Sequence, residues 1–192
     1  MNQGQSTPAL FLDRDGIINK DIGYLNELNK LEFVEGIFEL CKYFKSMNYK
    51  LIIVTNQSGV GRGIFPLERY YEIMEAITSK FSEHNIEFDL ILASTLNPES
   101  KIISNFESYR RKPNPGLILD ASEIMNIDLK NSILVGDKLT DIIAGRNAGI
   151  RKLYLLTNEK LDLEGDELFN CDKINSLHQL LITFNATEMR KE

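Results

Sequence analysis

Two carboxylates, Asp13 and Asp15, follow a short apolar run near the start of the chain. The run (residues 9–12, ALFL) lies between a proline and a glycine and has the composition of a buried strand. Side chains alternate along an extended chain, so Asp13 and Asp15 are predicted to share one face while Arg14 points away. Two like charges this close need a cation or a proton to relieve them. The pair therefore indicates half of a metal site at a strand end, and the other half must come from elsewhere.

Three further polar clusters stand beside predicted strands or helices. They are residues 55–58 (TNQS) after the apolar run 49–54, residues 110–113 (RRKP) before a helix, and residues 136–141 (GDKLTD) after the apolar run 132–135. Each of the four clusters alone has an ordinary explanation: a surface acidic turn, a helix cap, a solvated basic loop or a capped helix start. Their order along one chain favours a single site, because ligands of parallel sheets sit beyond the carboxyl ends of the strands.

Strands and helices are predicted to alternate along the chain. The predicted strands are residues 9–12, 49–54, 89–93, 132–135, 151–155 and, weakly, 170–174. The predicted helices are residues 37–47, 67–84, 115–125, 140–148 (capped by Thr140) and a short one that ends at Leu180. Residues 94–114 are expected to be irregular. This alternation predicts an α/β fold with a doubly wound, Rossmann-like parallel sheet.

The spacing of the clusters also bears on domain organisation. About one strand–helix unit separates Asp13 from Thr55, and a similar span leads on to Lys112. We therefore expect no large cap domain and an open site covered by short loops. Residues 1–192 are expected to form one domain, with a loose N-terminus (1–7) and a short C-terminal tail (185–192).

Composition narrows the class of partner. The net charge of -6 argues against nucleic acid, although a local cluster such as Arg110, Arg111 and Lys112 can still bind a small anion. The chain has two cysteines, which lie far apart in the sequence, so we do not expect a disulfide framework. We find no transmembrane run, signal h-region or lipidation motif, so we expect a cytoplasmic protein without a membrane partner. The oligomeric state is open, with a monomer favoured.

Taken together, the four clusters resemble the motifs of the haloacid dehalogenase (HAD) superfamily. The resemblance narrows to the D-glycero-D-manno-heptose 1,7-bisphosphate phosphatases and the related histidinol-phosphate phosphatases, and it covers about residues 9–157. The segments that carry it are residues 11–19 (FLDRDGIIN), Gly23-Tyr24, residues 55–63 (TNQSGVGRG) and residues 111–116 (RKPNPG). It implies the HAD fold without a large cap.

The resemblance also implies a role for each motif. Asp13 would be the nucleophile that forms an aspartyl-phosphate, and Asp15 the general acid and base. Mg²⁺ would be bound by Asp13, the Asp15 backbone carbonyl and Asp137. Thr55 and Lys112 would complete the catalytic set by contacting the phosphoryl group. The implied substrate-binding residues are Asp21, Ile22, Gly23, Tyr24, Thr55, Asn56, Gln57, Ser58, Arg111, Lys112 and Lys138. Asp141 is expected to support the metal site through water or Lys138.

The chain departs from the family pattern at two places. Many heptose-bisphosphate phosphatases bind zinc through Cys and His ligands in a loop. The matching positions here are Ser94, Leu96, Ser108 and Arg110, so zinc is not expected and the loop must be ordered by packing or stay mobile. The other departure is Ile17, where the superfamily usually has threonine.

Three functions follow from the resemblance. The leading one is Mg²⁺-dependent removal of the 7-phosphate of D-glycero-D-manno-heptose 1,7-bisphosphate, a sugar phosphate of lipopolysaccharide or capsule precursor synthesis. The second is a histidinol-phosphate phosphatase. The third is a non-catalytic binding module on the same scaffold, against which the joint presence of Asp13, Asp15, Lys112 and Asp137 argues.

Overall fold

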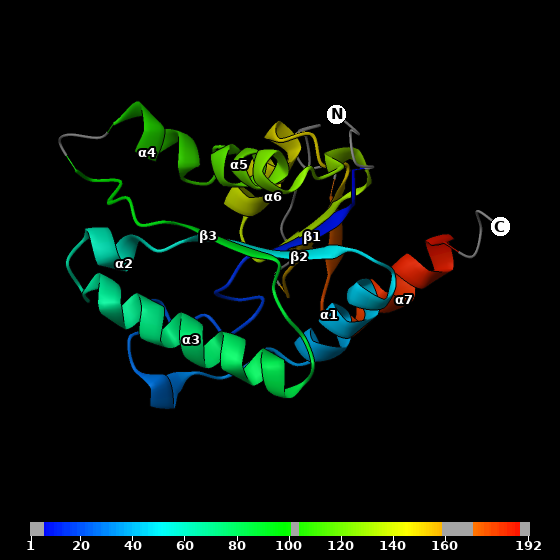
Figure 1. Cartoon of the computed structure of the whole chain (residues 1–192), viewed down its shortest axis with the longest axis horizontal. Coiled ribbons are helices and arrows are strands. Elements are labelled where there is room, and N and C mark those ends of the chain that lie inside the picture. The colour runs from blue at the N-terminus through cyan, green and yellow to red at the C-terminus, as the bar shows by residue number, and fades with distance from the viewer. Residues whose placement is uncertain (1–5, 101–103, 159–170, 189–192) are drawn as a thin grey trace.

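A computed structural model describes residues 6–100, 104–158 and 171–188. Its centre is a six-stranded parallel sheet in the order β3-β2-β1-β4-β5-β6 (Figure 1). The strands are β1 (Ala9–Leu12), β2 (Lys50–Asn56), β3 (Leu90–Ser94), β4 (Ile133–Gly136), β5 (Lys152–Leu156) and β6 (Asp172–Ile174). The predicted parallel α/β fold is confirmed.

Helices cover both faces of the sheet. They are α1 (Ile37–Ser46), α2 (Ser58–Gly61), α3 (Leu67–Glu83), α4 (Asn105–Arg110), α5 (Gly116–Met125), α6 (Leu139–Asn147) and α7 (Leu177–Glu188), with the 3₁₀ turns η1 (Leu28–Lys30) and η2 (Leu129–Asn131). Figure 1 shows α1, α3 and α7 on one side of the sheet, and α5 and α6 on the other. This is the doubly wound arrangement.

The central strand explains why the opening apolar run is continuous. Leu10 and Leu12 belong to the core beneath α1, α3 and α7, whereas Ala9 and Phe11 belong to the core beneath α5 and α6. All four are fully buried, as expected for a strand covered on both faces.

The sheet register brings three predicted clusters to one edge. β1 lies between β2 and β4, with Leu12 opposite Ile53 on one side and Val135 on the other. The residues that follow these strands therefore meet at the C-terminal edge of the sheet.

The structure corrects the expectations for residues 94–114 and for the start of α6. Helix α4 forms inside residues 94–114, where the sequence predicts irregular structure, and Ser104 and Glu107 close its first turn as a capping box. Helix α6 begins at Leu139, and the predicted Thr140 cap is wrong. The Asp141 carboxylate instead accepts a bond from the Lys138 amide at 3.0 Å.

The chain ends are more regular than expected. Residues 1–5 of the predicted loose N-terminus lie outside the described residues, but Thr7 pairs with Ile127, and its carbonyl accepts a bond from Asp128 N at 3.0 Å. Helix α7 continues to Glu188, past the predicted end at Leu180 and into the predicted tail, whose residues 189–192 are outside the described part. Residue 170 of the weak strand is also outside it. Among the described residues, no helix has the length and apolar character needed to cross a membrane.

Candidate active site

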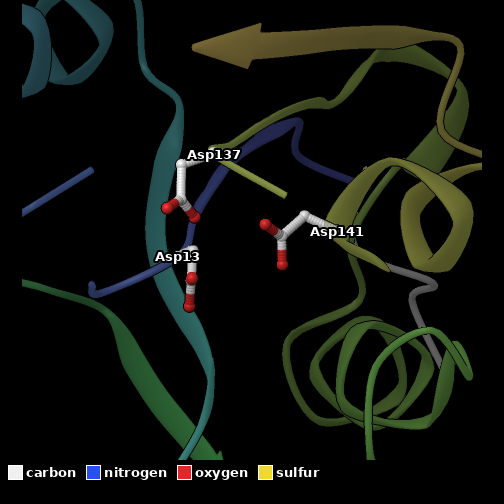
Figure 2. Close-up of side chains that lie close together, drawn as sticks. All are labelled: Asp13, Asp137 and Asp141. Atoms are coloured by element: carbon white, nitrogen blue, oxygen red, sulfur yellow. The ribbon is translucent and has the colours of Figure 1, made fainter. Parts of the chain in front are cut away.

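Three carboxylates meet beyond the ends of β1 and β4. Asp13 directly follows β1, Asp137 directly follows β4, and Asp141 lies in the first turn of α6. One oxygen from each lies within 4.8 Å of the others, and Figure 2 shows the carboxyl groups of Asp137 and Asp141 turned toward Asp13. The predicted meeting of Asp13 with Asp137 is present, and Asp141 is closer to it than the sequence suggested.

One buried ammonium group faces this cluster. Lys112 Nζ lies 2.8 Å from Asp13 Oδ1 and 2.6 Å from Asp141 Oδ1. It also donates to the Val54 carbonyl at 2.8 Å. Asn56 fixes the backbone of Lys112 from both sides, since its amide donates to the Lys112 carbonyl (3.0 Å) and accepts from the Lys112 amide (3.1 Å). Strand β2 thus positions the cation that the chain supplies from before α5.

The charges around Asp13 do not balance, because the three carboxylates face one buried lysine, Lys112, and Lys138 reaches Asp137 only at 3.9 Å. Burial raises the pKa of Asp13 to about 6, with Lys112 opposing the shift. Burial and the charge of Asp13 raise the pKa of Asp137 to about 7. Burial acts to lower the pKa of Lys112, but the two carboxylates outweigh it and hold that pKa above its usual range. The cluster needs further positive charge before Asp13 and Asp137 can both ionise at neutral pH.

The geometry fits a small oxygen-liganded cation at this point. Asp137 Oδ1 is buried, and no hydrogen-bond partner reaches it among the described residues. Gly16 allows the close approach of Asp137: its φ is +86°, and a Cβ there would lie 2.3 Å from Asp137 Oδ2. Both oxygens of Asp141 are already bonded, to Lys112 Nζ and the Lys138 amide. An oxygen of Asp137 is therefore the ligand left available for Mg²⁺.

Asp15 lies in a different environment, although it is only two residues from Asp13. Its two oxygens accept bonds from the Arg14 guanidinium, the Asn19 amide at 2.9 Å and the Gln57 amide at 2.9 Å. The Gln57 amide also donates to Thr55 Oγ1 at 2.9 Å. The fully buried Thr55 is thereby tied to the Asp15 side chain.

The expectation that Arg14 points away from the carboxylates is wrong. Its Nη2 lies 2.7 Å from Asp15 Oδ2, and the side chain is buried. The alternation argument fails because β1 ends at Leu12, and the chain turns at once, with the amides of Ile18 and Asn19 bonding to the Arg14 carbonyl. In a turn, neighbouring side chains can meet.

A cavity of about 430 Å³ opens beside these groups. Of the predicted site residues, its lining includes Asp15, Asp21, Gly23, Tyr24, Asn56, Gln57, Ser58, Arg111, Lys112 and Lys138. Ile22 does not line it and is 49% exposed. Asp13 and Thr55 are not among the lining residues, and Asp137 lines two other cavities instead. The individual roles assigned to these residues stay predictions.

The cavity lining also contains residues that the sequence analysis did not select, namely Gly59, Phe65 and Thr140. A Cβ at Gly59 would lie 2.4 Å from the Phe65 ring, so this glycine lets Phe65 pack against the wall. Phe65 carries no local sequence signal, because an aromatic residue before a helix is ordinary in any core. Thr140 stands in the polar cluster 136–141, but a threonine before a helix is equally typical of a helix cap.

Two cations besides Lys112 line the cavity, namely Lys138 and Arg111. Lys138 Nζ pairs with Asp21 at 2.7 Å, and the Gly23 amide also donates to the Asp21 carboxylate at 2.8 Å. Burial acts to raise the pKa of Asp21, but these bonds outweigh it and hold that pKa below its usual value. Arg111 donates to the Leu96 carbonyl at 3.4 Å, and among the described residues it forms no ion pair. Arg111 is therefore an available cation.

The four positions that replace the usual zinc ligands have ordinary roles here. Ser94 ends β3, and its carbonyl accepts a hydrogen bond from the backbone N–H of Gln57 at 2.7 Å. The Ser108 carbonyl accepts from Asn114, and Arg110 pairs with Asp120 at 2.9 Å. Leu96 is buried. The described part of the segment makes these contacts, and the expectations about zinc and about the order of the loop stay predictions.

The parallel sheet and the acidic site at its C-terminal edge define a hydrolase of the HAD-like class. The HAD-hydrolase-like family model matches residues 109–173. The crystal structure of D,D-heptose 1,7-bisphosphate phosphatase from B. bronchiseptica, complexed with magnesium and phosphate, has the same fold, with a TM-score of 0.78 at 24% identity, covering 92% of this chain and 99% of that one.

Curated relatives give the family within this class. The D-glycero-beta-D-manno-heptose-1,7-bisphosphate 7-phosphatase of Vibrio cholerae is 39% identical over 163 residues, covering 84% of this chain and 88% of the relative. The D-glycero-alpha-D-manno-heptose-1,7-bisphosphate 7-phosphatase of Campylobacter jejuni is 41% identical over 160 residues, covering 83% and 87%. The chain belongs to this family of heptose-bisphosphate 7-phosphatases, and it is a phosphatase.

Proposed function

We propose that this phosphatase removes the 7-phosphate of D-glycero-D-manno-heptose 1,7-bisphosphate in a Mg²⁺-dependent reaction through an aspartyl-phosphate on Asp13. The observation that carries the proposal is the position of Asp13, 2.8 Å from the ammonium group of the buried Lys112, which itself lines a cavity together with further cations. The names of the Vibrio cholerae and Campylobacter jejuni relatives support the substrate, and they differ in its anomer.

In the first step, Asp13 attacks the phosphorus of the 7-phosphate. The ammonium group of Lys112 is fixed by three contacts, so it offers its charge to the phosphoryl oxygens without reorganising. Asp15 lines the cavity and would give a proton to the leaving C7 oxygen. The bond between phosphorus and that oxygen breaks as the bond to Asp13 forms.

In the second step, water attacks the aspartyl-phosphate. Asp15, now ionised, would take the proton of the water, and inorganic phosphate leaves with Asp13 restored. Asp13 and Asp137 would hold Mg²⁺, with the backbone carbonyl of Asp15 as the predicted third protein ligand. Bound there, Mg²⁺ supplies the positive charge that the three carboxylates and the phosphate together require.

The second phosphate of the substrate needs its own cation, because Lys112 is committed to the reacting one. Arg111 meets this need, since it lines the cavity and forms no ion pair among the described residues. Lys138 is already paired with Asp21, so it would bind substrate at the cost of that pair. A bisphosphorylated sugar therefore suits this cavity better than a monophosphate.

A substrate panel tests the proposal. Initial rates with Mg²⁺ would be measured for both anomers of the heptose bisphosphate, for histidinol phosphate and for simple phosphate esters. We expect kcat/KM for one heptose bisphosphate to exceed that of the simple esters by about 10²-fold. Equal rates across the panel would contradict the substrate assignment, and a preference for histidinol phosphate would replace it with the second function. Arg111→Met should reduce kcat/KM for the bisphosphate more than for monophosphates.

A further inference from the structure

The side chain of Arg14 forms a two-pronged contact with Asp15. Nη2 lies 2.7 Å from both carboxylate oxygens, and Nε donates to Oδ1 at 3.1 Å. A guanidinium fork matched to a carboxylate fixes its orientation as well as its position, which a single lysine bond does not.

The buried guanidinium of Arg14 has few partners among the described residues. The residue is only 1% exposed, and Asp15 is the sole acceptor that its guanidinium bonds within the described chain. Nη1 is buried there without a hydrogen-bond partner. Burying an arginine is unfavourable unless its contacts compensate for lost water. Arg14 leaves one buried nitrogen without a partner and bonds to a single carboxylate. A contribution to folding stability alone therefore explains its burial poorly.

The local backbone brings the two side chains together. The Ile18 and Asn19 amides bond to the Arg14 carbonyl at 2.8 and 3.1 Å, and the Gly16 amide bonds to the Asn19 carbonyl at 2.7 Å. This turn places the fully buried Asn19 against Asp15 Oδ1, while Gln57 reaches Oδ2 from the end of β2. Among the described residues, three side chains thus donate hydrogen bonds to Asp15, and Arg14 is the charged one of the three.

We propose that Arg14 is a positioning residue, which holds the Asp15 carboxyl group at the cavity wall in the orientation needed for proton transfer to and from the reacting oxygens. The inference rests on the proposed function, because it assumes that Asp15 is the acid and base. Its physical basis is that a side chain with free torsions reaches the leaving oxygen only part of the time, and a fixed one is always in place.

The test compares two substrates that differ in their need for a proton. The parameter kcat/KM reports only the steps up to departure of the leaving group. An alkyl phosphate requires a proton at that point, and p-nitrophenyl phosphate does not. The variants are Arg14→Met and Arg14→Lys, with Arg69→Met as a control that breaks the ion pair to Glu72 within helix α3. Circular dichroism and thermal melting would verify folding.

We expect Arg14→Met to lower kcat/KM about 10²-fold for the alkyl phosphate that the parent hydrolyses best. The value for p-nitrophenyl phosphate should stay close to the parental one. Arg14→Lys should recover part of the loss, and it carries the test if Arg14→Met does not fold. Equal losses with both substrates in a folded variant, or no loss with either, would overturn the inference.

Asp15→Asn separates this inference from the proposed function. It should show the same selective loss, and adding Arg14→Met to it should cause no further loss, since the two act through one group. If Asp15→Asn itself lacks the selective pattern, the acid–base role in the proposed function fails. If Asp15→Asn shows the pattern and Arg14→Met and Arg14→Lys do not, only the role of Arg14 fails.

Discussion

Asp13 and Asp15 are two residues apart, both are buried, and their surroundings are opposite. Asp13 lies among acids, with Asp137 and Asp141 beside it and Lys112 as the shared cation. Asp15 lies among donors, with Arg14, Asn19 and Gln57 around its two oxygens. The cluster around Asp13 has too little positive charge for its three carboxylates, whereas both oxygens of Asp15 accept hydrogen bonds.

This difference shows how one strand end can supply two functions. The crowded, charge-poor position suits a group that must bind a metal and attack phosphorus, because the missing charge arrives with the metal and the substrate. The donor-rich position suits a group whose orientation must be fixed while a proton moves. Substitutions on either side of this contrast should therefore differ in their effect.

The largest effect is expected from Asp13→Asn. The amide keeps the shape of the side chain but removes the nucleophile, so activity with the heptose bisphosphate should fall at least about 10⁴-fold. Steady-state kinetics would measure it, with Asp120→Asn as a matched control in the ion pair to Arg110. A variant that keeps a substantial part of the parental rate would rule out the covalent mechanism.

Lys112→Met should come next, because it removes the ammonium group that contacts both Asp13 and Asp141. Lys138 reaches the cluster only at Asp137, with 3.9 Å between Nζ and Oδ2. We expect kcat/KM to fall about 10³-fold from the lost phosphoryl contact. The free energy of unfolding should also fall, by about 3 kcal/mol, since three carboxylates are left facing one another. Chemical denaturation would measure the second effect against Lys130→Met, an exposed lysine in η2. Unchanged stability would show that the charge deficit around Asp13 is smaller than the geometry indicates.

The metal-free protein should lose stability as pH rises. Asp13 and Asp137 have pKa values raised from 3.8 to about 6 and about 7, so between about pH 4 and 7 the folded form holds more protons than the unfolded form. With chelator, Tm should therefore be lower at about pH 8 than at about pH 5. A fixed Mg²⁺ concentration of 100 times the Kd at about pH 8 should add about 2.7 kcal/mol at that pH, and less at about pH 5, where protons compete for the same carboxylates. Asp137→Asn should flatten both dependences, and a metal-free Tm that rises with pH would contradict the charge deficit.

The smallest effect is expected from Gln57→Leu, beside Asp15. Gln57→Leu removes the bond to Asp15 and the bond to Thr55, but it leaves Arg14 and Asn19 in place. One hydrogen bond to a charged group is worth about 1.5–3 kcal/mol, so we expect a loss of activity of about tenfold. Gln179→Leu, on the exposed face of α7, is the matched control. A loss as large as that of Asp15→Asn would mean that Gln57, and not Arg14, chiefly holds this carboxylate.

The sequence by itself determined the fold class, the sheet and most of the residues around the cavity. Continuous apolar runs marked strands covered on both faces, and polar clusters after them marked one edge of a parallel sheet. That argument needs only the order of elements along the chain, so it placed Asp13, Lys112 and Asp137 at one edge. The motif resemblance added the phosphatase class, which the comparisons with relatives confirm.

Only the tertiary structure decided how these groups pair. The side chain of Arg14 turns back to Asp15 because β1 ends one residue before Asp13, and strand alternation says nothing about the turn that follows. The direct contact of Asp141 with Lys112, and the close approach of Asp137 over Gly16, depend on the angle at which α6 leaves β4. Such contacts join residues far apart in sequence, and their formation depends on distances of a few ångströms that no local pattern encodes.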